Sequence, residues 1–412
     1  MGRIRYAILV AGCATLAGSV LAGVACGGGT AGDDKAASGD AAGDGLTVHV
    51  EGGVGDATAT NRDSGCAADT QVDVHNCGIC GHDCLGGACQ AGVCQPVVLA
   101  TVPYPGAVAA FAIDTTSVYW TNSSDGSDGG TLLANGVVSK CPLAGCTGHS
   151  TTLATGQAVP EGIWVTGPTL YWVDYNVGAI MQCSVDCNND ATVLHKFPDL
   201  GRKGFAANAT EAFISYEGAI EQCPTSGCGT LTTFASGQTP TDIALGAAGV
   251  TWIDLGTLTG GKAVVYVDGG VMTCPVGGCD GGPTALATGL SYPSSLFVNG
   301  MTAYWAQGNS VVACSVTGCS GTPTTIVSLP AGNGVAGVAV DATDVYFGDM
   351  SGNGPPYSWE IRKCALTGCP DGSTLLSSTQ YVSGGPVLEV AVDTTRIYFV
   401  SGDNSQILAL AK

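Results

Sequence analysis

One pattern of apolar and polar residues occurs seven times between residues 111 and 399. In its first copy, "FAIDTTSVYW" at 111–120, an apolar run is followed by a polar turn and an aromatic-rich run. The other copies are "IWVTGPTLYW", "FAANATEAFI", "IALGAAGVTW", "LFVNGMTAYW", "VAVDATDVYF" and "VAVDTTRIYF". Short apolar runs separated by turn residues predict antiparallel strand pairs, and the 64 glycines and 18 prolines agree with frequent turns. We therefore expect an all-β chain.

A second motif recurs between these copies. "CPLAGC" at 141–146 lies between two strand-like runs, "GVVSKC" and "TTLATG". Facing residues of an antiparallel pair lie within disulfide reach, so each cysteine pair is expected to close a hairpin covalently. Metal binding is the alternative, which the CxxxxC spacing disfavours. The six pairs are Cys141 with Cys146, Cys183 with Cys187, Cys223 with Cys228, Cys274 with Cys279, Cys314 with Cys319 and Cys364 with Cys369.

Both motifs together give four strands per unit of roughly 40 to 50 residues, which is typical of a β-propeller blade. The seventh unit lacks a fourth strand, because the sequence ends at "QILALAK". "VVLATVPYPGAVAAFAID", from residue 97, aligns with "TTLATGQAVPEGIWVTG", from residue 151, and so contains an unassigned outer strand at 97–102. We predict a seven-bladed propeller over residues 97–412, closed by this N-terminal strand.

"YWTN" at 119 and "YWVD" at 171 give the repeat its resemblance to the YWTD class of propellers. The resemblance implies that aromatic side chains of the second strand fill the space between blades. That class usually has six blades and no hairpin cystines, so the resemblance bears on the fold rather than on function.

The N-terminal residues have the pattern of an export signal. Arg3 and Arg5 precede "YAILVAGCATLAGSVLAGVAC", which fits a signal peptide over residues 1–25, with a transmembrane helix as the alternative. Residues 26–65 are rich in Gly, Ala and Asp and are expected to form a flexible tether. The arrangement resembles a bacterial lipoprotein signal, which implies a lipid on Cys26. "LVAGC", ending at Cys13, and simple secretion remain alternatives.

Residues 66–94 hold six cysteines and almost no large apolar side chains, which predicts a small segment held together by three disulfides of open connectivity. Zinc is the rival interpretation, because His75 and His82 lie close to a CxxC. "NCGICGHDC" resembles short cysteine-rich segments of predicted surface lipoproteins of large-genome Gram-negative bacteria. The six residues are Cys66, Cys77, Cys80, Cys84, Cys89 and Cys94.

Charge excludes some functions. A net charge of −20 and the lack of a Lys/Arg cluster argue against nucleic acid as a partner. The sequence shows no cofactor motif, no metal site and no set of catalytic residues. His149 and His195 are the only histidines of the predicted propeller, and Asp114, Asp341 and Asp393 are expected to form turn hydrogen bonds.

Function is expected where the repeats differ. The longest insertions, "NSSDGSDGGTLLANG", "DLGTLTGGKAVVYVDGG" and "GDMSGNGPPYSWE", fall between second and third strands, on the face opposite the cysteine hairpins. The candidate contacts of this face are Tyr266, Tyr357, Trp359, Asp125 and Asp128. The expected function is a lipid-anchored extracytoplasmic module on the periplasmic or outer surface of a bacterial envelope. It would bind an unknown protein or glycan and touch the membrane only through its lipid. A hydrolase or lactonase with a site at the central channel is the alternative.

Overall fold

All regular structure in the described part of the chain is β-strand. The structure, a computed structural model, describes residues 68–412 except 103–105, 125–134, 147–148, 176, 199–203, 237–238, 260–264, 280, 352–356, 370–371 and 382–388. The described residues belong to the unit Arg62–Lys412, and none of their elements is a helix that could cross a membrane. The tether, the signal segment and Cys66 lie outside them.

Seven four-stranded antiparallel sheets form the seven blades of a propeller, as predicted. Blades 1 to 3 are β4 (Gly106–Ile113), β5 (Ser117–Ser124), β6 (Gly136–Pro142) and β7 (Thr151–Gln157); β8 (Pro160–Thr166), β9 (Thr169–Asp174), β10 (Ala179–Ser184) and β11 (Thr192–Lys196); and β12 (Phe205–Ala207), β13 (Glu211–Tyr216), β14 (Ala219–Pro224) and β15 (Thr232–Ser236). Blade 4 is β16 (Pro240–Gly246), β17 (Gly249–Asp254), β20 (Gly269–Cys274) and β21 (Thr284–Leu290), with the added hairpin β18 (Thr257–Thr259) and β19 (Val265–Val267). Blades 5 to 7 are β22 (Pro293–Asn299), β23 (Thr302–Gln307), β24 (Ser310–Ser315) and β25 (Thr324–Ser328); β26 (Gly334–Val340), β27 (Asp344–Ser351), β28 (Tyr357–Ala365) and β29 (Thr374–Tyr381); and β30 (Val390–Val392), β31 (Arg396–Val400), β32 (Gln406–Ala411) and β3 (Val97–Thr101).

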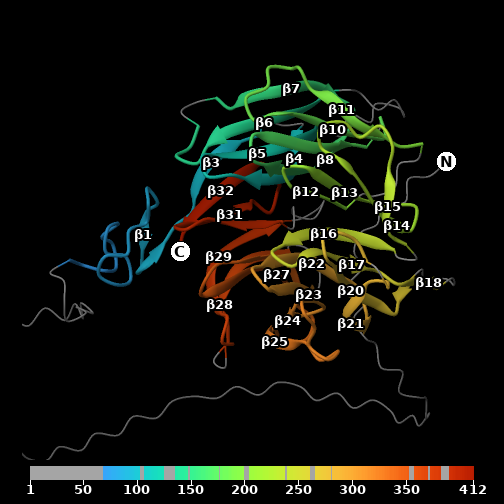
Figure 1. Cartoon of the computed structure of the whole chain (residues 1–412). Helices are drawn as coiled ribbons and strands as arrows, with labels where there is room; N and C mark the ends of the chain where they lie inside the picture. Colours follow the sequence, from blue (N-terminus) through green and yellow to red (C-terminus); the bar gives the residue numbers. More distant parts are fainter. Residues whose placement is uncertain are drawn as a thin grey trace, which may run out of the picture. The chain divides into compact units, whose positions relative to one another are not determined.

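The two ends of the propeller meet in blade 7. β3 pairs with β32 in antiparallel register, from Val97 opposite Ala409 to Thr101 opposite Gln406, and the two strands lie side by side in Figure 1. Leu99 on β3 is 2% exposed, in one apolar cluster with Trp120 of blade 1 and Tyr398 of blade 7. The predicted closure by the N-terminal strand is confirmed.

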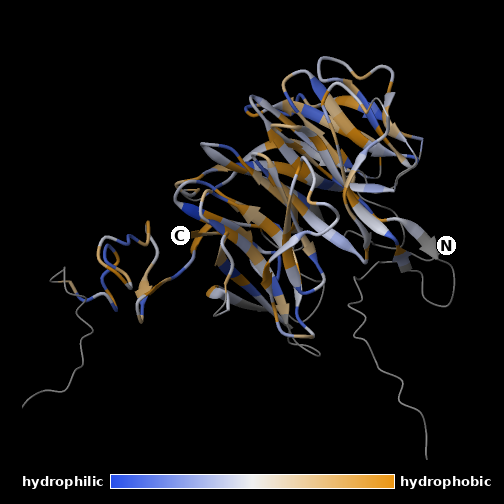
Figure 2. Ribbon diagram, turned by 60° about the horizontal axis from the view of Figure 1, so that its bottom comes forward, coloured by the Kyte–Doolittle hydropathy of each residue, from blue (hydrophilic) through white to orange (hydrophobic). Residues whose placement is uncertain are grey.

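Apolar residues concentrate along the strands, where neighbouring blades pack face to face (Figure 2). Five of the largest fully buried side chains are tryptophans, each from the second or third strand of its blade. They are Trp120, Trp172, Trp252, Trp305 and Trp359. The aromatic part of the repeat is therefore the interblade core, as the resemblance implied.

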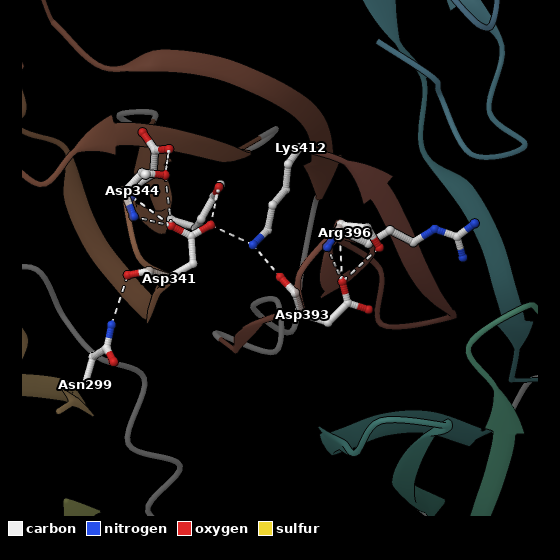
Figure 3. Close-up of polar contacts among 9 residues, drawn as sticks. Asn299, Asp341, Asp344, Asp393, Arg396 and Lys412 are labelled. Atoms are coloured by element: carbon white, nitrogen blue, oxygen red, sulfur yellow. Dashed lines mark hydrogen bonds and ion pairs between the residues drawn. The ribbon is translucent and has the colours of Figure 1, made fainter. Parts of the chain in front are cut away.

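The turn between the first and second strands uses one device in three blades. Asp114, Asp341 and Asp393 each accept the backbone N–H groups two and three residues later and the Tyr hydroxyl five residues later. Lys412 Nζ adds a bond to Asp341 Oδ2 of 2.6 Å and also reaches the Asp393 carbonyl, which ties blade 6 to blade 7 (Figure 3). Burial opposes ionisation of Asp341, but these donors hold the pKa of its carboxyl well below its usual range. The predicted turn role of the three aspartates is confirmed.

All six predicted hairpin disulfides are present, with Cα–Cα distances from 5.2 to 5.8 Å. The second cysteine of each pair lies in the loop after the third strand, so each bond closes a turn rather than two facing strand residues. Each cystine also packs on the outer strand of the preceding blade. Cys141 Sγ, for example, lies 3.5 Å from Leu99 O, and Cys187 Sγ lies 3.5 Å from Leu153 O. The number of disulfides indicates an exported protein.

Blade 7 has no hairpin cystine. Leu410, opposite Ile397, takes the place that Cys141 takes opposite Val118 in blade 1. The cysteine-rich segment occupies this place, since its disulfides Cys77–Cys89 and Cys84–Cys94 pack in one cluster with Ile397 and Leu410 of blade 7 and Leu376 of blade 6. In blade 7 the cysteine-rich segment therefore takes the position that a hairpin disulfide has in the other six blades.

Polar contacts fix the segment there. Arg396 donates to Leu143 O in the blade 1 hairpin at 2.8 Å and to Leu85 O in the segment at 2.7 Å. His82 places Nδ1 2.7 Å from Cys77 O and Nε2 2.7 Å from Lys412 O. His82 therefore links the segment to the last residue of blade 7.

Candidate functional site

The face with the insertions, here called the insertion face, is built on aspartates that end the second strand. Asp174 accepts Ala158 N–H at 3.0 Å in blade 2, and Asp254 accepts Thr239 N–H at 3.0 Å in blade 4. In each case the donor belongs to the loop that enters the blade. The carboxylates therefore hold the interblade loops in place on this face.

In blade 4 the insertion is a short hairpin with a fixed base. β18 pairs with β19 through Thr257 and Val267, and Leu258 faces Tyr266. Gly256, at φ +79°, precedes the hairpin; a Cβ there would lie 2.2 Å from Val267 O, so only glycine fits. Asp254 accepts Gly256 N–H at 2.8 Å, and Thr239 donates to Gly256 O at 3.1 Å.

Two tyrosines meet beside this base. Tyr266 on β19 and Tyr292, in the loop between blades 4 and 5, have ring centroids 6.4 Å apart and ring planes at 87°. Tyr292 is 48% exposed, an unusual position for a large aromatic side chain. Its φ of 49° is left-handed, which costs about 1 to 2 kcal/mol for a residue other than glycine. This strained, exposed aromatic side chain is the clearest local sign of a binding surface.

Blade 6 carries a partly buried ionic group on the same face, in which only Asp349 is fully buried. Arg362 Nε lies 2.9 Å from Asp349 Oδ2, Arg362 Nη2 lies 2.6 Å from Glu360 Oε2, and Asn333 donates to Asp349 at 2.9 Å. Burial raises the pKa of Asp349, although Arg362 opposes the rise. The charges satisfy one another, so the group supports the loop that enters blade 6 rather than presenting a charge to a ligand.

The residues predicted to contact a partner differ in where the structure places them. Tyr266 lies on the insertion face, as expected. Trp359 is 1% exposed in the core, where its indole fills the space above Gly348, so it is not available as a surface anchor. Asp125 and Asp128 lie outside the described residues, and the structure describes Tyr357 only as a backbone position on β28. Tyr292, which sequence reasoning missed, joins Tyr266.

The innermost strands carry carboxylates that sequence reasoning also missed. The residue just before the repeat copy is Asp242 in blade 4 and Ser295 in blade 5, both at a register shift of the inner strand, and Glu389 in blade 7, directly before β30. Each accepts a backbone N–H of the next blade. Glu389 bonds Phe111 N–H at 2.8 Å, Asp242 bonds Leu296 N–H at 3.3 Å and Ser295 Oγ bonds Gly337 N–H at 2.9 Å.

Glu389 and Asp242 both lie at the innermost strands, which surround the central axis. They belong to blades 7 and 4, which are not neighbours, yet the charge of Asp242 acts on Glu389. Burial, with help from Asp242 and against the Phe111 N–H bond, raises the pKa of Glu389 to about 7. Sequence reasoning did not single out either residue.

Among the residues that the structure describes, the one group with the spacing of a metal site is Cys77, Cys84 and Cys89. All three are bonded in disulfides, and Cys80 is disulfide-bonded as well, so these sulfurs do not hold zinc. His75 pairs instead with Asp83 at 2.9 Å. The disulfide interpretation of the segment is confirmed over its described part.

No family model matches the sequence, and neither does any curated protein. Solved structures do match. Virginiamycin B lyase from Staphylococcus aureus superposes with a TM-score of 0.53 at 12% identity, over 77% of this chain and 98% of that chain.

A catalytically inactive variant of the same lyase with quinupristin gives a TM-score of 0.52 at 12% identity, over 77% of this chain and 98% of that one. The nidogen/laminin complex gives 0.39 at 19% identity, over 52% of this chain and 78% of that one. The likeness to the lyase shows the fold alone.

Proposed function

We propose that the protein is an exported, lipid-anchored binding module that recognises its partner with the insertion face. The observation that carries the proposal is the pair of the half-buried Tyr266 and the exposed Tyr292, which meet beside the fixed base of the blade 4 hairpin. Aromatic side chains dominate binding energy at interfaces because they bury much area at little entropic cost. The propeller supplies the rigid support, clipped by cystines on the opposite face.

Removing the hairpin tests the site. In one variant an Asn-Gly turn replaces residues 258–266, which suits the remaining Thr257–Val267 pair. We expect binding to a panel of cell-surface proteins and glycans to fall at least about tenfold, as expected when a hot spot is lost. Val276→Ser removes a 44%-exposed side chain from the cystine loop of the same blade and should leave binding unchanged. If the hairpin variant and the intact protein bound equally well, the proposal that the insertion face is the binding surface would be contradicted.

The anchor is proposed at Cys26, in the membrane of a bacterial envelope, and rests on the signal-like N-terminus and the tether composition. Mass spectrometry of the membrane fraction should find a mature chain that begins at a lipidated Cys26. Cys26→Ser should release the protein to the soluble fraction, while Cys13→Ser should not. A mature chain without lipid mass would mean simple secretion instead.

A hydrolase or lactonase at the axis is the second candidate. Glu389 favours it, because a half-buried carboxyl with a pKa of about 7 suits a general base near neutral pH. The same carboxyl already accepts Phe111 N–H at the junction of blades 7 and 1, which is a structural task. Hydrolysis of a lactone or ester panel that Glu389→Gln abolishes would favour the enzyme over the binding module.

A further inference from the structure

The insertion face of blade 4 belongs to an unusually acidic part of the chain. Between residues 204 and 361, eleven residues are Asp or Glu, and Lys262 is the single basic residue. These residues form blades 3, 4 and 5 and the first half of blade 6. The local excess of negative charge, 11 − 1 = 10, is half of the total net charge of −20. Seven of the eleven lie in blades 3 and 4, and this local excess of negative charge attracts cations and speeds their encounter. The other four lie in blade 6, where Arg362 and Lys412 neutralise part of their charge.

The tyrosine pair adds a specific cation-binding geometry to this field. An aromatic face attracts a cation through its quadrupole, and edge-to-face packing leaves one face of each aromatic ring uncovered by the other. Tyr266 and Tyr292 meet at 87°, and Tyr292 is nearly half exposed. Asp268 follows β19 directly and is an exposed residue.

The strand pairing places the backbone of Asp268 close to that of Tyr292. Gly269, next to Asp268, pairs with Leu290, two residues before Tyr292. Asp268 also has a left-handed φ of 58°, as Tyr292 has one of 49°. Two perpendicular aromatic rings beside a carboxylate are the elements of sites that hold ammonium and guanidinium groups.

We infer that Tyr266, Tyr292 and Asp268 bind a cationic side chain, Arg or Lys, of a partner protein. The inference rests on the proposed function, since it names the chemistry that the insertion face recognises. The acidic blades attract the basic segment, and the tyrosine pair fixes one of its side chains. The partner is thus a protein with an exposed basic segment rather than a neutral glycan.

The test is a titration of the intact protein with a fluorescent peptide of four arginines separated by glycines, at an ionic strength of about 0.15 M to screen weak long-range attraction. The citrulline version of the peptide keeps the shape and loses the charge. We expect the arginine peptide to bind at least tenfold more tightly. Tyr266→Ala and Tyr292→Ala should each weaken it about fivefold, in the range of one cation–π contact, and Tyr292→Phe should stay within about twofold of the wild type.

Two Asp→Asn variants distinguish a specific contact at the tyrosine pair from a general effect of net charge. Asp268→Asn should weaken binding several-fold, whereas Asp190→Asn, an exposed carboxylate in the cystine-face loop of blade 2, should not. Equal effects of the two changes, unchanged binding by both alanine variants, or equal binding of the citrulline peptide would each overturn the inference. A further outcome would separate the two proposals. If a neutral glycan bound the intact protein, if removal of the blade 4 hairpin weakened that binding, and if the arginine peptide did not bind, the insertion face would be supported as the binding site and the cationic partner would be contradicted. Circular dichroism melting confirms that each variant is folded; if Tyr292→Ala is not, Tyr292→Leu takes its place.

Discussion

Leu99→Asp is expected to cost roughly 5 kcal/mol or more of unfolding free energy, because it puts an unpaired carboxylate at the closing strand of the propeller. Leu99 is 2% exposed between blades 7 and 1 and contacts the Cys141 cystine through its carbonyl. A loss of this size is comparable with the whole stability of many domains. Thermal melting should show a midpoint lower by more than about 10 °C, or no folded state.

The neighbouring residue is the control. Val98 points to the other side of β3 and is 45% exposed, so Val98→Asp should cost less than about 1 kcal/mol. If the two aspartate variants melted alike, β3 would not be the strand that closes blade 7.

Glu389→Gln is expected to stabilise the protein above neutral pH. Because the pKa of Glu389 is raised from 4.5 to about 7, the folded protein holds this proton more tightly than the unfolded chain does. Wild-type stability therefore falls as the pH rises from about 4.5 to about 7 and then levels off. A shift of this size corresponds to about 3 kcal/mol. The glutamine stays neutral and still accepts Phe111 N–H, so it avoids that loss.

Urea unfolding of both proteins across the pH range measures the difference. It should be near zero below about pH 4.5 and reach about 3 kcal/mol at pH 8. Asp242→Asn removes a charge that raises the pKa of Glu389, so in its presence the difference should level off at a lower pH and at a smaller value. A difference that does not depend on pH, or a glutamine variant less stable at pH 8, would contradict the assignment of this carboxyl to the axis.

Much of the fold could be predicted from the sequence because each blade repeats the same local information. The apolar runs, turn residues and cysteine pairs fix four strands per unit, and the missing last strand follows from counting. The alignment of residues 97 and 151 gave the closure, which the pairing of Val97 with Ala409 confirms. Because this local pattern is repeated in every blade, the propeller fold can be predicted from the sequence.

The residues that were misjudged depend on contacts between distant segments. Trp359 follows an insertion in the sequence, but it enters the core because Gly348 on β27 leaves room for its indole. Asp242 lies at an irregularity of its inner strand, which changes the side that a residue presents and which a simple two-residue period does not show. Glu389 lies directly before β30 and reaches Phe111 in the next blade. One signal was present: both directly precede a copy of the repeat.

The role of the cysteine-rich segment was hidden for a similar reason. Its composition predicted disulfides, but its place depends on Leu410 standing where other blades have a cysteine. The Arg396 bonds to Leu143 and Leu85 then connect blade 7 with blade 1 and the segment. The segment is thus held together by its own disulfides and also contacts the propeller where blades 7 and 1 meet.

Peptide-level hydrogen exchange of the intact protein, with and without a saturating four-arginine peptide, tests most directly whether recognition occurs on the insertion face. The account predicts slower exchange in residues 254–268 and 290–296, which contain the hairpin and both tyrosines. Slower exchange confined to the cystine loops, such as residues 141–150 and 274–283, or to the segment 75–94, would place binding on the opposite side and contradict it.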